Sequence, residues 1–120
     1  MKKIFIVDDD VDFCSEVKDL LEHYNFQVSV AYEGWIALNQ VRKKHVDLVL
    51  FDIKLQLLSG FYFINLLKTN EKLKDIPVFV VSAIGDKENI TRAYALGVSE
   101  YFQKPIDTEK LVSKIEQYLL

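Results

Sequence analysis

The chain has 120 residues, a formal net charge of −3 from 18 acidic and 15 basic side chains, and a 50% share of hydrophobic residues. This length suits one domain, so we expect a single domain over residues 1–120. The mild negative charge argues against direct binding to nucleic acid or to an anionic membrane surface. Cys14 is the only cysteine, and no stretch reaches the roughly eighteen apolar residues of a membrane span. We therefore expect a cytoplasmic protein without a disulfide or a membrane segment.

Short apolar runs rich in β-branched residues alternate with longer amphipathic segments along the whole sequence. The runs Leu48–Phe51 and Val78–Val81 lack polar alternation, which is typical of parallel strands that are covered on both faces. The five expected strands are Lys3–Asp8, Gln27–Tyr32, Asp47–Asp52, Pro77–Ser82 and Ser99–Gln103.

The amphipathic segments carry apolar residues at helical spacing. In the first of them, Cys14, Val17, Leu21 and Tyr24 fall on one stripe. Gly97 follows a later segment and indicates a helix C-cap, because glycine adopts positive φ at little cost. The five expected helices run from about Val11 to Tyr24, Gly34 to Lys44, Gly60 to Asn70, Asp86 to Leu96 and Thr108 to Leu120.

Five successive strand-then-helix units predict an α/β fold. Right-handed helical crossovers between parallel strands give a doubly wound, five-stranded parallel sheet, and the common strand order for such a sheet is 2-1-3-4-5. This is a flavodoxin-like three-layer α/β/α sandwich. In such folds ligands bind beyond the carboxyl ends of the strands, where the strand order reverses.

Polar residues follow several expected strands at these carboxyl ends. Asp8 and Asp9 follow the first strand, Asp52 ends the third, Ser82 ends the fourth, and Lys104 follows the fifth. The strand order places the three acids together with the serine and the lysine facing them. Carboxylates so close repel one another unless a cation is present, and Mg²⁺ or Mn²⁺ uses few carboxylates together with phosphate and water oxygens. The arrangement predicts a site that receives a phosphoryl group on a carboxylate.

The motifs Val7-Asp8-Asp9, Asp52, Ser82-Ala83, Tyr101 and Lys104-Pro105 occur in this order along the chain. Together they resemble the receiver domain of two-component response regulators, in the manner of a chemotaxis-type stand-alone receiver. The resemblance covers the whole chain, and its specificity lies in the combination rather than in any one motif.

The resemblance implies a role for each matching position. Asp52 is the phosphoacceptor, a carboxylate nucleophile toward a phosphohistidine donor. Asp8, Asp9 and the backbone carbonyl of Lys54 hold the metal with Asp52. Lys104 pairs with the carboxylate and then with a phosphoryl oxygen.

The resemblance also implies how the signal leaves the site. Ser82 moves toward the phosphoryl group, Tyr101 turns inward as it does so, and the Lys104–Pro105 peptide bond is cis. The change is read at the fourth helix, fifth strand and fifth helix. The implied partners are a histidine kinase or histidine phosphotransfer protein and an unidentified downstream protein or effector domain, and a phosphorylation-dependent homodimer is left open.

The sequence departs from the family pattern in the loop after Asp52. Gln56 stands where the family often has proline, and the loop Lys54–Gly60 is unusually apolar. Beyond Ser82, the bulky Ile84 should hinder an attacking water and lengthen the phosphorylated lifetime. This last statement is our hypothesis from the position of the side chain.

Two other functions fit parts of the sequence. A haloacid-dehalogenase-like phosphatase would use Asp8 and Asp10, but position 12 is aspartate where that family needs threonine or valine, and Asp52 would have no role. A nucleotide- or flavin-binding module would need a glycine- or hydroxyl-rich phosphate loop after the first strand. We expect no sustained enzymatic turnover.

Several conspicuous residues have a simpler interpretation. Asp10 and Asp12 are typical of turns and helix caps. His23 and His45 lack a histidine or cysteine partner at metal-ligand spacing, so we expect them at the surface. We expect packing roles for Trp35 and for the run Phe61–Phe63.

Overall fold

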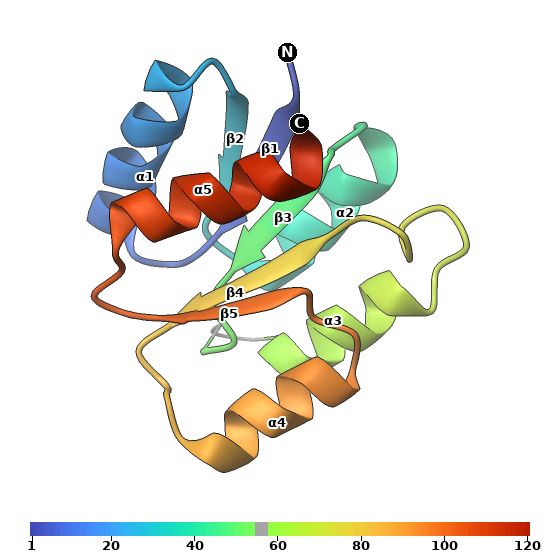
Figure 1. Ribbon diagram of the computed structural model, residues 1–120. Helices are drawn as coiled ribbons and strands as arrows, with labels where there is room; N and C mark the ends of the chain where they lie inside the picture. Colours follow the sequence, from blue (N-terminus) through green and yellow to red (C-terminus); the bar gives the residue numbers. More distant parts are fainter. Residues whose placement is uncertain (55–57) are drawn as a thin grey trace.

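A computed structural model of the chain describes residues 1–54 and 58–120. In this part strands and helices alternate strictly, and every expected element is present with ends that agree within two residues (Figure 1). In chain order the elements are β1 (Lys3–Val7), α1 (Val11–His23), β2 (Gln27–Ala31), α2 (Gly34–Lys43), β3 (Leu48–Phe51), α3 (Gly60–Lys68), β4 (Val78–Ser82), α4 (Lys87–Ala95), β5 (Glu100–Gln103) and α5 (Thr108–Leu119).

The described strands form one parallel sheet in the order β2-β1-β3-β4-β5, which confirms the predicted topology. The switch in strand order lies between β1 and β3, whose last residues Val7 and Phe51 are in register. The chain therefore leaves these two strands at the same edge of the sheet.

Alternate side chains of each central strand enter different layers. Ile4 and Ile6 pack with the apolar faces of α1 and α5, whereas Phe5 and Val7 pack with those of α2, α3 and α4. Figure 1 shows α1 and α5 together on one side of the sheet and α3 and α4 on the other. Burial on both faces explains why these strands are apolar without alternation.

The ends of the helices follow local chemistry. Asp10 caps α1, because its side chain accepts a hydrogen bond from the backbone N–H of Phe13. Gly97 has φ +106°, as a C-terminal cap requires. The predicted stripe of α1 is correct for Cys14, Val17 and Leu21, which are buried. It is wrong for Tyr24, which lies just beyond the end of the helix and is 45% exposed.

The packing role expected for these aromatic residues holds in full only for Phe63. Phe63 is fully buried, but Trp35 and Tyr62 are each 49% exposed, with their ring centroids 6.4 Å apart. Tyr62 precedes Phe63 in α3 and points about 100° away from it, because successive helical residues rotate by that angle. The sequence expectation failed because hydrophobicity alone does not say which side of a short helix faces the core.

Gly60, the first residue of α3, lies against the backbone of the loop after β3. A Cβ atom at this position would lie 2.3 Å from the Cα atom of Ile53. Only glycine allows such an approach, so Gly60 fixes how closely α3 packs against the loop that carries Asp52. No helix in the described part of the chain is long and apolar enough to cross a membrane.

Candidate functional site

Two predicted acids meet where β1 and β3 end. Asp8 directly follows β1, and Asp52 directly follows β3. The backbone N–H of Asp52 donates a hydrogen bond to the carbonyl of Val7 at 3.1 Å, so the sheet ladder itself places the two residues side by side. Both are buried, with exposed fractions of 1% for Asp8 and 6% for Asp52.

Lys104 joins these two acids from the other side of the switch point. Its backbone N–H donates to the carbonyl of Ser82 at 2.8 Å, which extends the pairing of β4 with β5. Its ammonium nitrogen Nζ then lies 2.8 Å from Oδ2 of Asp8 and 3.4 Å from Oδ2 of Asp52. The peptide bond that follows, to Pro105, is cis.

The remaining carboxylate oxygens are held by backbone N–H groups. Oδ1 of Asp8 accepts from the N–H of Asp10 at 3.0 Å, and Oδ1 of Asp52 accepts from the N–H of Lys54 at 2.9 Å. Each acid thus has one oxygen fixed by its own loop and the other directed toward Lys104. Such fixed orientation is what a reacting carboxylate needs.

Burial and charge act against each other at this site. Burial raises the pKa of Asp8 above its ordinary value, and the hydrogen bond and charge of Lys104 offset only part of that rise. Burial by itself lowers the pKa of Lys104, but its hydrogen bond to Asp8 and the charges of Asp8 and Asp52 raise it overall. Lys104 therefore carries its positive charge at neutral pH.

Cys14 lies directly behind this site without adding reactivity to it. Its Sγ donates to the backbone carbonyl of Asp8 at 3.4 Å. Burial, reinforced by the charge of Asp8, raises the pKa of the Cys14 thiol to about 12. A thiol that stays protonated is a poor nucleophile, so Cys14 is a packing residue.

The donors at this site suit a hard cation. Asp8 and Asp52 offer carboxylate oxygens only, and Mg²⁺ commonly uses one or two carboxylates together with water and phosphate oxygens. The next residue, Asp9, is exposed, and within residues 1–54 and 58–120 no three carboxylate, histidine or cysteine side chains form an enclosed metal-binding group. Asp8 and Asp52 therefore fit such an ion, while Asp9 and the carbonyl of Lys54 stay predicted ligands.

Ser82 and Tyr101 are linked through the loop after β4. Ser82 is fully buried, and its hydroxyl oxygen accepts from the N–H of Ile84 at 3.2 Å. The Tyr101 hydroxyl donates to the carbonyl of Ile84. Burial raises the pKa of Tyr101, and the charge of Asp52 adds to the rise. The two residues assigned to the switch thus contact the same residue of one loop.

The structure adds two contacts that the sequence did not predict. The ring of Phe13 faces Lys104, whose Nζ lies 4.1 Å from the ring centroid. The Tyr94 hydroxyl accepts from the backbone N–H of Tyr101 at 3.1 Å. Neither contact has a sequence signature, although the position of Phe13 in the first turn of a helix that begins beside Asp8 indicates its proximity.

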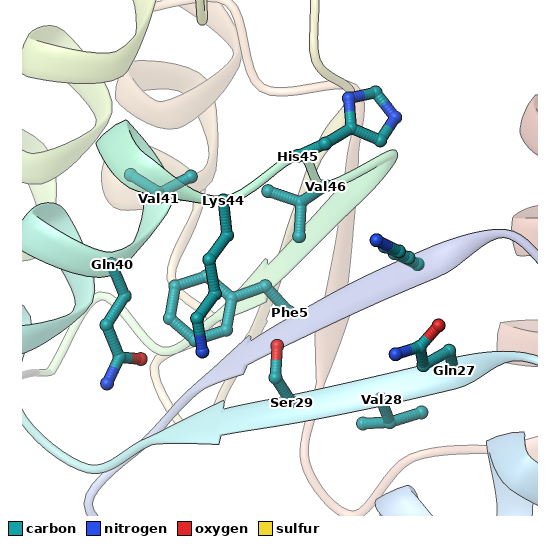
Figure 2. A pocket seen from close by; sticks show the side chains of 10 residues that line it. Phe5, Gln27, Val28, Ser29, Gln40, Val41, Lys44, His45 and Val46 are labelled. Atoms are coloured by element: carbon teal, nitrogen blue, oxygen red, sulfur yellow. The ribbon is translucent and has the colours of Figure 1, made fainter.

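A separate cavity of about 230 Å³ lies between α2 and the β1–β2 edge of the sheet, near the amino ends of these strands (Figure 2). Its polar side chains Gln27, Lys44 and His45 are exposed. Asp52 and Lys104, at the opposite ends of their strands, take no part in it. Gln56 and the part of the apolar loop that covers residues 55–57 lie outside the described residues.

Comparison with known proteins agrees with this geometry. The family model of the response regulator receiver domain matches residues 4–116. The transcriptional regulatory protein CrdR of Helicobacter pylori is 30% identical over 98% of this chain, and ZraR of Salmonella typhimurium is 34% identical over 97%. The chain spans 54% of the length of CrdR and 26% of that of ZraR.

Among solved structures, the chemotaxis protein CheY4 of Vibrio cholerae matches with a TM-score of 0.91 and 24% identity over 99% of both chains. This likeness establishes the flavodoxin-like fold. The chain thus belongs to the response regulator receiver domain family. It is a phosphorylation-activated switch of the two-component type, and a haloacid-dehalogenase-like phosphatase gains no support from these matches.

Proposed function

We propose that Asp52 is the phosphoacceptor of this receiver and that residues 1–120 act as one switch domain. The observation that carries the proposal is the position of Lys104 Nζ, 2.8 Å from Asp8 and 3.4 Å from Asp52. An ammonium between two buried carboxylates orients Asp52, and it can neutralise the charge that a phosphoryl group brings.

In the reaction a carboxylate oxygen of Asp52 attacks the phosphorus of a phosphohistidine. The P–N bond breaks as the new P–O bond forms, and the electron pair returns to the imidazole, which takes up a proton from solvent. Lys104, which has three N–H donors, turns from the Asp52 carboxylate to a phosphoryl oxygen. The backbone N–H of Lys54 holds the other oxygen of the Asp52 carboxylate, Oδ1, at 2.9 Å.

Asp8 and Asp52, with Asp9 and the carbonyl of Lys54 as further ligands, would hold Mg²⁺ or Mn²⁺ at this site. When bound, the ion supplies positive charge that neutralises carboxylate and phosphoryl oxygens. The buried position of Asp8 supports this assignment, because Lys104 offsets only part of the cost of its negative charge.

The phosphorylated state would be read at the face of α4, β5 and α5. Ser82 and Tyr101 both form hydrogen bonds with the backbone of Ile84. A Ser82 hydroxyl that is drawn toward the phosphoryl group therefore moves Ile84 and changes its hydrogen bond with Tyr101. On this face Tyr94 and Tyr118 are 46% and 42% exposed. The donor would be a histidine kinase or histidine phosphotransfer protein in the cytoplasm, and the reader an unidentified protein, an effector domain or a second copy of the chain.

The direct test is labelling with acetyl phosphate and Mg²⁺, followed by intact mass spectrometry. We expect the wild type and Asp75→Asn, a change at an exposed aspartate, to gain one phosphoryl group. Asp52→Asn should gain none. Labelling of Asp52→Asn to the wild-type extent would contradict the proposal.

The same samples separate a switch from an enzyme. A receiver reaches a stoichiometric plateau of labelling and gives no sustained release of phosphate from a phosphomonoester. Multiple turnovers that depend on Asp8 and survive Asp52→Asn would instead indicate a phosphatase.

A further inference from the structure

The ammonium of Lys104 is bounded on one side by an aromatic ring as well as by two acids. Its Nζ lies 4.1 Å from the centroid of the Phe13 ring, within the range of a cation–π interaction. The same nitrogen lies 2.8 Å from Asp8 and 3.4 Å from Asp52. Lys104 is only 19% exposed at its side chain, so little water competes for the charge.

The ring is itself held in place by the loop that holds Asp8. The N–H of Phe13 donates to Oδ1 of Asp10 at 3.1 Å, and the N–H of Asp10 donates to Oδ1 of Asp8 at 3.0 Å. The Phe13 side chain packs against the core layer beneath α1 and α5. Ring and carboxylate are thus fixed by one short segment, while Lys104 reaches them on a flexible stem of four carbons.

A ring face attracts an ammonium without accepting a conventional hydrogen bond from it. An apolar side chain of equal size would fill the space but would leave the ammonium free to tilt toward solvent. An acid in the same place would take one of the three N–H donors of the ammonium. An aromatic ring keeps Lys104 between Asp8 and Asp52 with a donor still available for a phosphoryl oxygen.

We propose that Phe13 is a positioning residue for phosphorylation, whose ring holds the Lys104 ammonium beside Asp8 and Asp52 through a cation–π contact. This inference rests on the proposed function of Asp52. A packing role alone would make leucine nearly as good as phenylalanine at this position. A cation–π role makes the result depend on the electron density of the ring.

The test places mono-, di- and trifluorophenylalanine at position 13, because fluorine withdraws charge from the ring face with little change of shape. We expect the rate of Asp52 labelling by acetyl phosphate to fall stepwise across the series, roughly two- to fivefold in total. Phe61 is the matched control, since its ring faces a different cation, with the guanidinium carbon of Arg92 4.0 Å from its centroid. The same series at position 61 should leave the rate unchanged.

A second measurement follows Lys104 without phosphorylation or metal. Protons over a ring face are shifted upfield in NMR spectra, so the ε-methylene of Lys104 should be upfield in the wild type and should move downfield along the position-13 series. Phe13→Leu should abolish the shift. A flat labelling rate with an unchanged Lys104 shift, or an equal loss of rate in both series, would overturn the inference. Absence of labelling in the wild type would overturn the role of Asp52, while the NMR series would still decide the contact.

Discussion

At the residue scale, the site is built around one positive charge that serves two buried acids unequally. Lys104 is closer to Asp8 than to Asp52. The more deeply buried acid, Asp8, has a raised pKa, because burial penalises its charged form more than Lys104 favours it. The domain therefore carries a carboxylate whose charge opposes folding.

This imbalance predicts that Asp8→Asn raises the free energy of unfolding near neutral pH in metal-free buffer. With the folded pKa above the unfolded value, the ionised acid costs stability above the folded pKa, and the cost vanishes below the unfolded value of about 3.9. The advantage of the variant should therefore shrink as pH falls toward about 4. Urea unfolding followed by fluorescence of Trp35, the only tryptophan, measures the free energy of unfolding of both proteins. A gain in stability of Asp8→Asn that does not change with pH would contradict the explanation.

The lifetime of the phosphorylated state should depend on Ile84. Only the backbone of Ile84 takes part in the hydrogen bonds with Ser82 and Tyr101, so its half-buried side chain can change while these contacts persist. We expect Ile84→Glu to speed the loss of the label several-fold, because a carboxylate can orient the attacking water that isoleucine excludes. Ile84→Val is the control. Equal decay of labelled wild type and Ile84→Glu would refute the hypothesis.

At the scale of elements, the fit of α3 against the loop after β3 depends on the missing side chain of Gly60. We expect Gly60→Ala to cost about 1–3 kcal/mol, because the added Cβ would meet the backbone of Ile53, which has little room to move. It should also slow labelling of Asp52, one residue before Ile53.

Gly85 provides a matched comparison for this substitution. The three atoms nearest to a Cβ there all belong to the amide end of the Gln103 side chain, which can rotate away. Chemical denaturation of both alanine variants should therefore give a clearly larger loss for Gly60→Ala. Equal losses would show that the close approach of α3 is not a constraint.

The sequence was most informative where one physical cause dominates. Apolar runs such as Leu48–Phe51 predicted strands because a central parallel strand must be buried on both faces. Asp8 and Asp52 could be placed together because sheet order alone aligns the strand ends. The orientations of Trp35 and Tyr62, and the contact of Phe13 with Lys104, could not be predicted, since they depend on how separate elements pack rather than on local spacing.

At the scale of the whole molecule, the acids at the switch point link metal binding to the stability of the fold. An ion that binds only the folded chain adds stability in proportion to the logarithm of its concentration, about 2.7 kcal/mol at a hundredfold excess over its dissociation constant. We expect Mg²⁺ to raise the melting temperature, and a chelator to reverse the effect.

Substitution separates this effect from a general influence of salt. Asp52→Asn should remove most of the Mg²⁺-dependent stabilisation, whereas the exposed change Asp75→Asn should keep it. Calorimetry at constant ionic strength measures both. An equal rise of the melting temperature with Mg²⁺ in the wild type, Asp52→Asn and Asp75→Asn would contradict metal binding at Asp52.

The hydroxyl of Tyr94 has a consequence for association of the chain. Among the strands that the structure describes, β5 pairs with β4 alone, so its other side is an open edge where a foreign strand could pair. Tyr94 already occupies the N–H of Tyr101 there. A partner strand that extends the sheet must first displace the Tyr94 hydroxyl from this N–H. The contact therefore disfavours non-specific strand pairing and aggregation at β5.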